Sequence, residues 1–575
     1  MLSDLTSWKK NWALMRTFYT GDEIASVSER LKKLKMDTIV FCSFESRFAR
    51  SGGLAAVTMN ILPYLKEVNN IPSVILMTPF YSKIMDENRL QSTSASFKVT
   101  FNKKPVHVDI YEYEWSYEQP ARGTLKEYYL RADGFFEASN KLNDPYIYES
   151  LDEERNSAVQ TDNALFFCKA VPLALNALGI KKNIVFHLNE WQTSLISLTA
   201  KEAMLNGTLE SCGTVQTMHN SYDSGVPWNK LSGLLNGTRR KKIPGPLALS
   251  AYQIGLQLVD APVTTVSDHF SDELISDILQ TGHYAPHLQS IMKAGGVSGV
   301  NNGMFINLCP EFPKAERHTP GEVRKIKLKM RKALLRILST YNPPERFGEL
   351  TYKGKTISKL PDDVPILAMS GRLDPTQKGY DIFLRAIEKF SEDEIKVVLT
   401  PLPVNLSDLD YFYEVACKCR GNLTVFPVRL QKGYQELQTG ATFGIMPSIY
   451  EPFGAAVEYM ASGTVNIGRA TGGLVDQIDS ACGFLYKEDA PFYTEENILD
   501  FINSSRIIQT RKKNPWAQSM ADNLYEVIKK AIDVYQNHSD EYYQMVLNGF
   551  KKAGQFSWKI SAKKYYEVYK MTGRI

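Results

Sequence analysis

Short runs of apolar residues alternate with helical patterns along most of the chain. Such runs, bounded by Gly, Pro, Asn or Ser, are typical of buried parallel strands, and the helical patterns between them are typical of crossover helices. The alternation predicts an α/β fold. Residues 97–132 are rich in Tyr and predict hairpin strands instead. The apolar runs lie at 38–42, 74–79, 183–187, 213–218, 263–267, 395–400, 423–428, 443–446 and 464–467.

The 575-residue chain is too long for a single core, so more than one domain is expected. Prolines at 343, 344 and 361 indicate a connector over 336–362, between domains at 37–335 and 363–555. Residues 1–36 predict a helical extension. Its aromatic stripe of Trp8, Trp12 and Phe18 favours packing against the body, although a surface contact with a membrane stays possible for an amphipathic basic helix.

Two adjacent strand-to-helix crossings between residues 443 and 476 carry the most informative polar residues. The first holds Glu451 and Gly454, and the second holds Thr471, Gly472 and Gly473. Ligands of open parallel sheets lie beyond the carboxyl ends of the strands, where helix N-termini point. A carboxylate beside glycine N–H groups suits a phosphorylated ligand rich in hydroxyls. Helix capping by the glutamate and a plain loop at the glycines are the alternatives.

Two further crossings carry groups of the same kind. The strand after Val364 delivers Arg372, and Lys378 follows on the next loop, so two cations could neutralise a diphosphate. Near the first strand, Arg50 precedes the pair Gly52 and Gly53, where a ligand could approach the backbone closely.

The order of these motifs resembles that of glycogen and starch synthases. The strings P-S-x-x-E-P-F-G, A-S-G-T-V and R-A-T-G-G-L-V-D around residues 447–476 are similar to the donor site of that family. The family consists of retaining glycosyltransferases of the GT-B fold, so the resemblance implies two facing Rossmann-like domains with a cleft between them. The closing string F-S-W at 556–558 is similar to the start of the family's last helix, which implies that 556–575 returns to the first domain.

The resemblance also implies an activity and a set of site residues. It implies transfer of a hexose, with glucose expected, from a nucleoside diphosphate sugar to an α-glucan. UDP- or ADP-glucose is the expected donor, and neither a cofactor nor a metal ion is expected. The implied catalytic residues are His219, Arg372, Lys378 and Glu451, and the implied donor-binding residues are Arg50, Gly52, Gly53, Asn302, Arg429, Tyr434, Gly454, Thr471, Gly472 and Gly473.

Several positions depart from the family pattern. Ala56 and Phe305 each replace an aspartate, and Asn189 replaces a histidine in the family's His-x-His-Asp-Trp-His string. These changes leave two alternatives open. One is a GT-B glycosyltransferase with a changed acceptor, a protein or a small molecule, and the other is a non-catalytic carbohydrate-binding relative. The nucleotide base, the sugar and the acceptor are not fixed by the sequence.

Composition changes this picture little. The formal net charge of +4 gives no reason to expect a nucleic acid partner, but it is compatible with an anionic donor. The 7 cysteines are scattered and odd in number, which favours reduced thiols and a cytoplasmic protein. No apolar run reaches the length of a membrane span. A basic loop at 237–242 predicts either a solvated loop or a flap that guides the acceptor.

Overall fold

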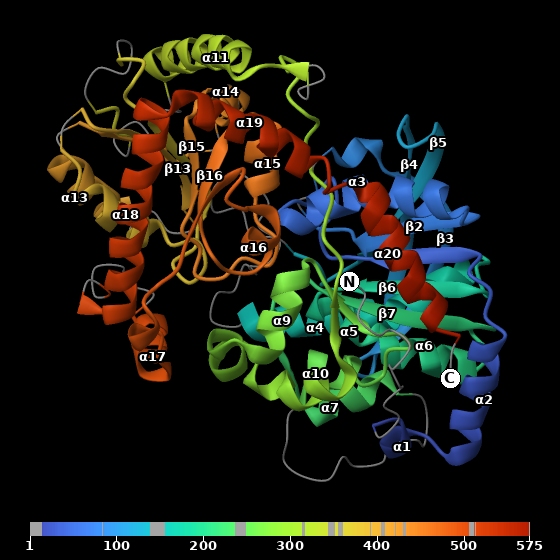
Figure 1. Ribbon diagram of the computed structural model, residues 1–575. Helices are drawn as coiled ribbons and strands as arrows, with labels where there is room; N and C mark the ends of the chain where they lie inside the picture. The colour runs from blue at the N-terminus through green and yellow to red at the C-terminus, as the bar shows by residue number, and fades with distance from the viewer. Residues whose placement is uncertain are drawn as a thin grey trace. The chain divides into compact units, whose positions relative to one another are not determined.

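The structure, a computed structural model, describes residues 14–573 with internal gaps (Figure 1). The gaps are 83, 85, 138–155, 236–248, 313–316, 343–350, 355–359, 392, 404–408, 420, 429, 431–432, 505–510 and 512. The described chain divides into two compact units. Unit 1 comprises Met1–Gly303 and Trp558–Ile575, and unit 2 comprises Met304–Ser557.

Unit 1 is built on a nine-stranded sheet. Seven neighbouring strands are parallel, and a tyrosine-rich hairpin adds two antiparallel strands at one edge. The predicted alternation of strand and helix produces the parallel part, and the hairpin pattern produces the edge. In spatial order the strands are β11 (Val297–Gly299), β10 (Val263–Thr265), β7 (Cys212–Met218), β6 (Ile184–Asn189), β1 (Thr38–Cys42), β2 (Ser73–Pro79), β5 (Gly123–Ala132), β4 (Lys104–Tyr117) and β3 (Gln91–Phe101).

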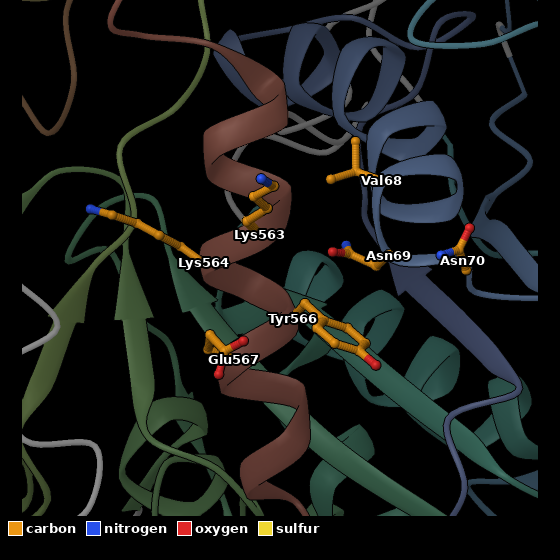
Figure 2. Close-up of a pocket in the computed structure, with 7 residues that line it drawn as sticks. All are labelled: Val68, Asn69, Asn70, Lys563, Lys564, Tyr566 and Glu567. Atoms are coloured by element: carbon orange, nitrogen blue, oxygen red, sulfur yellow. The ribbon is translucent and has the colours of Figure 1, made fainter.

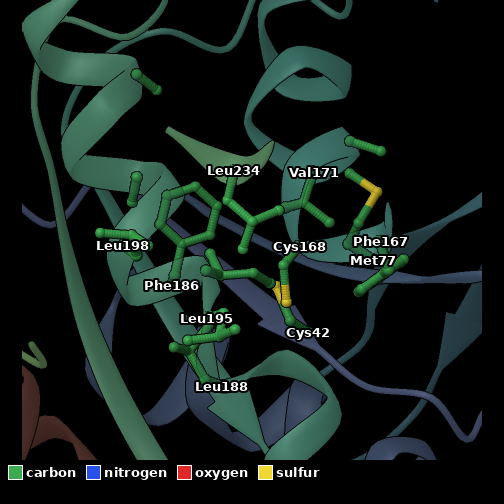
Figure 3. Close-up of a cluster of buried hydrophobic side chains, with 14 of the residues drawn as sticks. Cys42, Met77, Phe167, Cys168, Val171, Phe186, Leu188, Leu195, Leu198 and Leu234 are labelled. Atoms are coloured by element: carbon green, nitrogen blue, oxygen red, sulfur yellow. The ribbon is translucent and has the colours of Figure 1, made fainter. Parts of the chain in front are cut away.

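Helices cover this sheet and close its core. Figure 3 shows Phe167, Cys168 and Val171 of one long helix packed with Met77 and Phe186 of the strands. That helix is apolar around most of its circumference because it is buried within the unit. The main helices of unit 1 are α3 (Gly53–Asn69), α4 (Asn156–Ala177), α5 (Trp191–Ser194), α6 (Ile196–Leu205), α8 (Ala251–Gly255), α9 (Asp268–Ser276), α10 (Gln289–Gly295) and α20 (Trp558–Met571).

The described part of the N-terminal extension contains two helices, α1 (Met15–Phe18) and α2 (Gly21–Lys32). Thr20 begins α2 with a capping box, and Val27 and Leu31 on its apolar face are fully buried in the unit 1 core. The described part of the extension therefore packs against the body. The aromatic residues Trp8 and Trp12 lie outside the described residues.

Unit 2 is built on a six-stranded sheet that is parallel throughout. Its strands in spatial order are β14 (Leu423–Val425), β13 (Lys396–Pro403), β12 (Ile366–Leu373), β15 (Phe443–Met446), β16 (Val465–Arg469) and β17 (Gly483–Tyr486). Its helices are α11 (Pro320–Thr340), α12 (Tyr380–Ile387), α13 (Asp410–Lys418), α14 (Tyr434–Gly440), α15 (Ala456–Ala461), α16 (Gly473–Gln477), α17 (Glu495–Asn503), α18 (Pro515–Asn537) and α19 (Ser539–Ala553).

The boundary between the units lies at Gly303, earlier than the predicted end of the first domain at residue 335. The difference arises because α11 packs on the second sheet. Lys327 of α11 donates to the Ala441 carbonyl at 3.0 Å, and Arg331 donates to the Val364 carbonyl at 2.6 Å. Helix α11 therefore belongs to unit 2, while α20 belongs to unit 1.

The strand order reverses once in each parallel sheet. In unit 2 the chain runs from β12 outward to β14, then resumes on the other side of β12 with β15. In unit 1 it runs from β1 to β2 and on through β3, β4 and β5 on that side, then crosses to β6 on the other side of β1. In open α/β sheets, ligands bind at the carboxyl ends of the two strands between which the order reverses.

Glu458 of α15 makes stability depend on pH. Its carboxyl is buried, with Oε1 accepting from the Phe305 N–H at 3.1 Å and Oε2 without a partner among the described residues. Burial raises the pKa of Glu458 to about 7. Between pH 4.5 and about 7 the folded state therefore holds a proton that the unfolded state has released. The free energy of unfolding falls as pH rises through this range, and the stabilisation present at low pH is lost above about 7.

We therefore expect the unfolding free energy of the parent to fall between about pH 5 and 8. Glu458→Gln, which keeps an acceptor for Phe305 without a charge, is expected to reduce that slope. Urea unfolding at about pH 5 and pH 8 measures the change in the free energy of unfolding. Glu526→Gln on the exposed face of α18 is the matched control, because its side chain is 65% exposed. A slope shared by the parent and both variants contradicts the assignment.

Candidate functional site

The reversal point of the second sheet gathers the cations and the carboxylate predicted from the sequence. Arg372 is the penultimate residue of β12 and Lys378 lies on the loop that follows this strand, while Glu451 lies on the loop after β15. Strands β12 and β15 are direct neighbours. The two loops thus meet at the carboxyl edge of the sheet, where open α/β sheets bind ligands.

A glycine locks the two loops together. Gly379 has φ 66°, and a Cβ at this position would lie 2.0 Å from the Pro447 carbonyl oxygen. Only glycine fits so close to a neighbouring backbone with that φ. The Ile449 N–H also donates to the Gln377 carbonyl at 2.7 Å. The loop that carries Lys378 is therefore fixed against the loop that carries Glu451.

The Glu451 carboxylate is held by two side chains. Oε2 lies 2.7 Å from the Lys378 ammonium and accepts from the Ser448 hydroxyl at 2.9 Å. The side chain of Glu451 is 7% exposed and that of Lys378 is 24% exposed, so this ion pair is largely shielded from water. Helix α15 has no side-chain cap, which excludes the capping alternative for Glu451. Its carboxylate belongs to the site rather than to a helix end.

The second predicted crossing supports the backbone of this glutamate. Gly472 has φ 47°, and a Cβ there would lie 1.9 Å from the Glu451 carbonyl oxygen. The Gly473 N–H donates to the same oxygen at 2.9 Å. A Cβ on Gly454 would lie 2.9 Å from Cγ of Glu451. These glycines therefore let the chain pack around Glu451, and the Gly473 N–H is already engaged rather than directed at a phosphate.

The remaining predicted site residues of unit 2 that the structure describes lie on β12, on the turn after β16 and at the start of α14. Arg372 is partly buried, and its guanidinium lies 3.4 Å from Oε1 of Gln377. Thr471 ends the turn after β16, where its N–H donates to the Arg469 carbonyl at 2.9 Å. Tyr434 begins α14 and is 42% exposed. Arg429 lies outside the described residues, as does the basic loop at 237–242.

In unit 1, a carboxylate of the chain itself occupies the predicted glycine site. Glu45 accepts from the N–H groups of Ser51 at 3.2 Å, Gly52 at 2.7 Å and Ala55 at 3.1 Å. Glu45 is 3% exposed and lies at the positive N-terminal end of α3. The Gly52 N–H is therefore not free for a donor phosphate. The glycine admits the carboxylate, because a Cβ on Gly52 would lie 3.1 Å from it.

Three other predicted residues of unit 1 have different surroundings. Arg50 is exposed, and its Nε donates to the Arg47 carbonyl at 2.8 Å. Gly53 begins α3, with open space around its Cα. Asn302 is 4% exposed, and its N–H donates to the Val266 carbonyl at 3.3 Å. None of these contacts by itself assigns a donor-binding role.

His219 directly follows β7 and is partly buried. Its Nε2 lies 2.9 Å from Oδ1 of Asn189, which ends β6. Burial lowers the pKa of His219 to about 3, so the ring is neutral near pH 7. The neighbouring Glu190 is also buried, accepting from Asn220 Nδ2 at 3.1 Å and Tyr252 Oη at 3.3 Å. Burial raises the pKa of the Glu190 carboxyl well above its ordinary value.

Sequence reasoning missed Glu45 and Ser448. Glu45 could have been found, because it is an acid on the loop between the first strand and the glycine pair, just as Glu451 is an acid on the loop between a strand and a helix. Ser448 stands inside the string that carries Glu451.

A hollow of about 550 Å³ lies apart from these groups, between the end of α3 and α20 (Figure 2). Its polar groups hold α20 in place: Asn69 donates to the Ala562 carbonyl at 3.0 Å, and Lys564 lies 3.4 Å from Asp268. No predicted site residue lines the hollow. The lining residues are Val68, Asn69, Asn70, Lys563, Lys564, Tyr566 and Glu567.

Within the described ranges, no group of three or more His, Cys, Asp or Glu side chains is placed to hold a metal ion. Among the helices in that part of the chain, none combines the length and apolar character needed to cross a membrane.

Comparison with known proteins agrees with this geometry. Residues 38–291 match the family model of the starch synthase catalytic domain, and residues 353–514 match that of group 1 glycosyl transferases. A glycogen synthase of Lachnospira eligens is 26% identical over 541 residues, 91% of this chain and 97% of the relative. A glycogen synthase of Thermotoga maritima is 26% identical over 561 residues, 92% of this chain and 98% of the relative.

The fold has a counterpart among solved structures. The catalytic domain of starch synthase IV from Arabidopsis thaliana, bound to ADP and acarbose, superposes with a TM-score of 0.69. The match covers 94% of this chain and 100% of that domain at 17% sequence identity. This fold match agrees with the two family models and with the relatives that span the chain. The chain is a glycosyltransferase of the GT-B fold, and its sequence is similar to those of glycogen and starch synthases along more than nine-tenths of its length.

Proposed function

We propose that this enzyme transfers glucose from a nucleoside diphosphate sugar to an α-glucan, with retention of the anomeric configuration. The observation that carries the proposal is the pair of Lys378 and Glu451 at the reversal point of the second sheet, with Arg372 in contact with Gln377, the residue before Lys378. Glycogen synthase relatives that match along more than nine-tenths of the chain support a glucan acceptor over a protein or a small molecule.

In this proposal the two cations stabilise the leaving group. The bond between the anomeric carbon and the diphosphate breaks, negative charge develops on the diphosphate, and Arg372 and Lys378 neutralise it. The acceptor hydroxyl bonds to the same face of the anomeric carbon and gives its proton to the departing phosphate oxygen. Lys378 has three N–H donors, so it can keep its contact with Glu451 while another N–H donates to the phosphate.

Glu451 is assigned to the transferred sugar. A carboxylate accepts hydrogen bonds from hydroxyls, and charge-assisted bonds of this kind fix the orientation of a ring. Lys378 and Ser448 both contact Oε2, which leaves Oε1 as the oxygen assigned to the sugar. His219 of unit 1 is assigned a contact with a sugar hydroxyl.

The donor is proposed to be UDP- or ADP-glucose, with charge neutralisation by the two cations and no metal ion. Transfer is therefore expected to survive chelation of divalent cations. A cytoplasmic location is also proposed, because the six described cysteine side chains are all free and buried.

A donor panel tests the proposed function directly. Radiolabelled UDP-glucose, ADP-glucose and other nucleotide sugars are each incubated with the enzyme, with and without glycogen. Incorporation of glucose into glycogen from one of the two glucose donors is expected. Hydrolysis of every donor without incorporation, or transfer to a non-glucan acceptor alone, would contradict the proposal.

The clamp prediction concerns Arg372 and Lys378. Replacing either with Ala is expected to lower kcat/KM by about 100-fold or more, since a preorganised charge opposite the leaving group is lost. Lys418→Ala is the matched control, because this lysine of unit 2 is 48% exposed and pairs with Glu414. Normal turnover by both clamp variants would place the donor diphosphate elsewhere.

Glu451→Gln separates chemistry from stability. The amide keeps the size of the side chain and removes the charge, so we expect near-normal Tm, retained binding of nucleoside diphosphate and severely reduced transfer. Asp260→Asn is the control, because Asp260 forms a buried ion pair with Lys201 at 3.2 Å in unit 1. That variant is expected to melt earlier and to keep its transfer rate below the melting range. The reverse pattern would make Glu451 structural.

A further inference from the structure

The side-chain amide of Asn189 is oriented by the backbone on one side. Its Nδ2 lies 3.1 Å from the Cys42 carbonyl oxygen and 3.2 Å from the His187 carbonyl oxygen. Both of these atoms are acceptors only, so the NH₂ group must face them. Asn189 is 1% exposed, which leaves no water to compensate a reversed amide. Its Oδ1 is consequently fixed on the opposite side.

That oxygen determines which nitrogen of His219 carries the proton. Oδ1 of Asn189 lies 2.9 Å from Nε2 of His219, and an amide oxygen can only accept. Nε2 must therefore be the N–H nitrogen. In a neutral imidazole the second nitrogen then has a lone pair, so Nδ1 is a hydrogen-bond acceptor.

The groups around His219 are consistent with a neutral ring. His187 is fully buried between Tyr569, 2.7 Å from Nδ1, and Thr217, 2.7 Å from Nε2. Burial lowers the pKa of His187 to about 3, so this neighbour carries no charge near pH 7. Glu190 next to Asn189 has a raised pKa because it is buried, and the charge of Glu45 raises it further. No ionised partner in this set favours an imidazolium.

We propose that Asn189 is a positioning residue that holds His219 as the Nε2–H tautomer, so that Nδ1 accepts a hydrogen bond from a sugar hydroxyl. The inference rests on the proposed function for its ligand, a hydroxyl of the hexose. It assigns a specific task to the position where this chain departs from the family's histidine. The amide cannot titrate, so the tautomer of His219 is fixed at every pH at which the ring is neutral.

The tautomer is measured on the unmodified enzyme. Ring ¹⁵N resonances distinguish protonated from unprotonated nitrogens, and the chain has 8 histidines whose signals must be separated. His219→Gln identifies the resonances that belong to His219. A protonated Nε2 and an unprotonated Nδ1 at pH 7 are expected. A protonated Nδ1, or a ring protonated at both nitrogens, would overturn the proposal without any activity measurement.

The role in transfer is tested with Asn189→Asp. A carboxylate 2.9 Å from Nε2 is expected to raise the pKa of His219, because an opposite charge favours the imidazolium. Below that pKa, Nδ1 carries a proton and cannot accept. We expect kcat to fall roughly tenfold at pH 6 relative to pH 8.5, the effect of losing one hydrogen bond. Binding of free nucleoside diphosphate is expected to stay unchanged, and the parent is expected to lack this pH step.

Asn69→Asp is the matched control. Asn69 also donates to two backbone carbonyls of unit 1, those of Leu65 at 3.2 Å and Ala562 at 3.0 Å, but it lies at the hollow beside α20 (Figure 2). It is expected to lose stability and to keep the parental pH profile. A parental profile in Asn189→Asp overturns the positioning role. An inactive parent with the Nε2–H ring contradicts the proposed function instead, so the two failures are distinguishable.

Discussion

The reversal of strand order beside β12 is the constraint on which the donor side depends. Strands β13 and β15 flank β12 on opposite sides, and the loops after β12 and β15 pack against each other at the carboxyl edge of the sheet. Lys378 and Glu451 come from these two loops. Unit 1 repeats the arrangement, with Glu45 after β1 and Asn189 at the end of β6. Topology thus selects the positions at which chemistry is possible, and the local sequence selects which groups occupy them.

Charges at these positions have partners inside the protein. Glu45 accepts hydrogen bonds from three backbone N–H groups at the start of α3, and Glu451 forms an ion pair with Lys378. Each pairing removes the large cost of an isolated buried charge. It also fixes the geometry in advance, so less ordering remains for the moment of binding. A neutral group is fixed in advance in the same way, because backbone carbonyls orient the Asn189 amide that contacts His219.

The sequence predicts elements better than it predicts partners. The run at 38–42 coincides with β1 (Thr38–Cys42) because all five residues are buried, and such a run has few alternatives. The periodicity of α11 (Pro320–Thr340) indicates an apolar face, but it does not indicate which sheet that face covers. Gly52 shows the same limit. The sequence predicts a Gly52 N–H at the start of a helix. It does not predict that this N–H donates to Glu45, seven residues earlier, because that contact depends on the path of the loop.

The arrangement of unit 1 has a consequence for biosynthesis. Unit 2 is a continuous segment inserted between Gly303 and Trp558, so its sheet can form while translation continues. Unit 1 must wait, because α20 follows unit 2 in the chain and supplies Tyr569 to the buried His187. Until α20 leaves the ribosome, the face of α3 against which it packs stays uncovered. Helix α20, which is synthesised after unit 2, therefore completes unit 1, whose synthesis begins first.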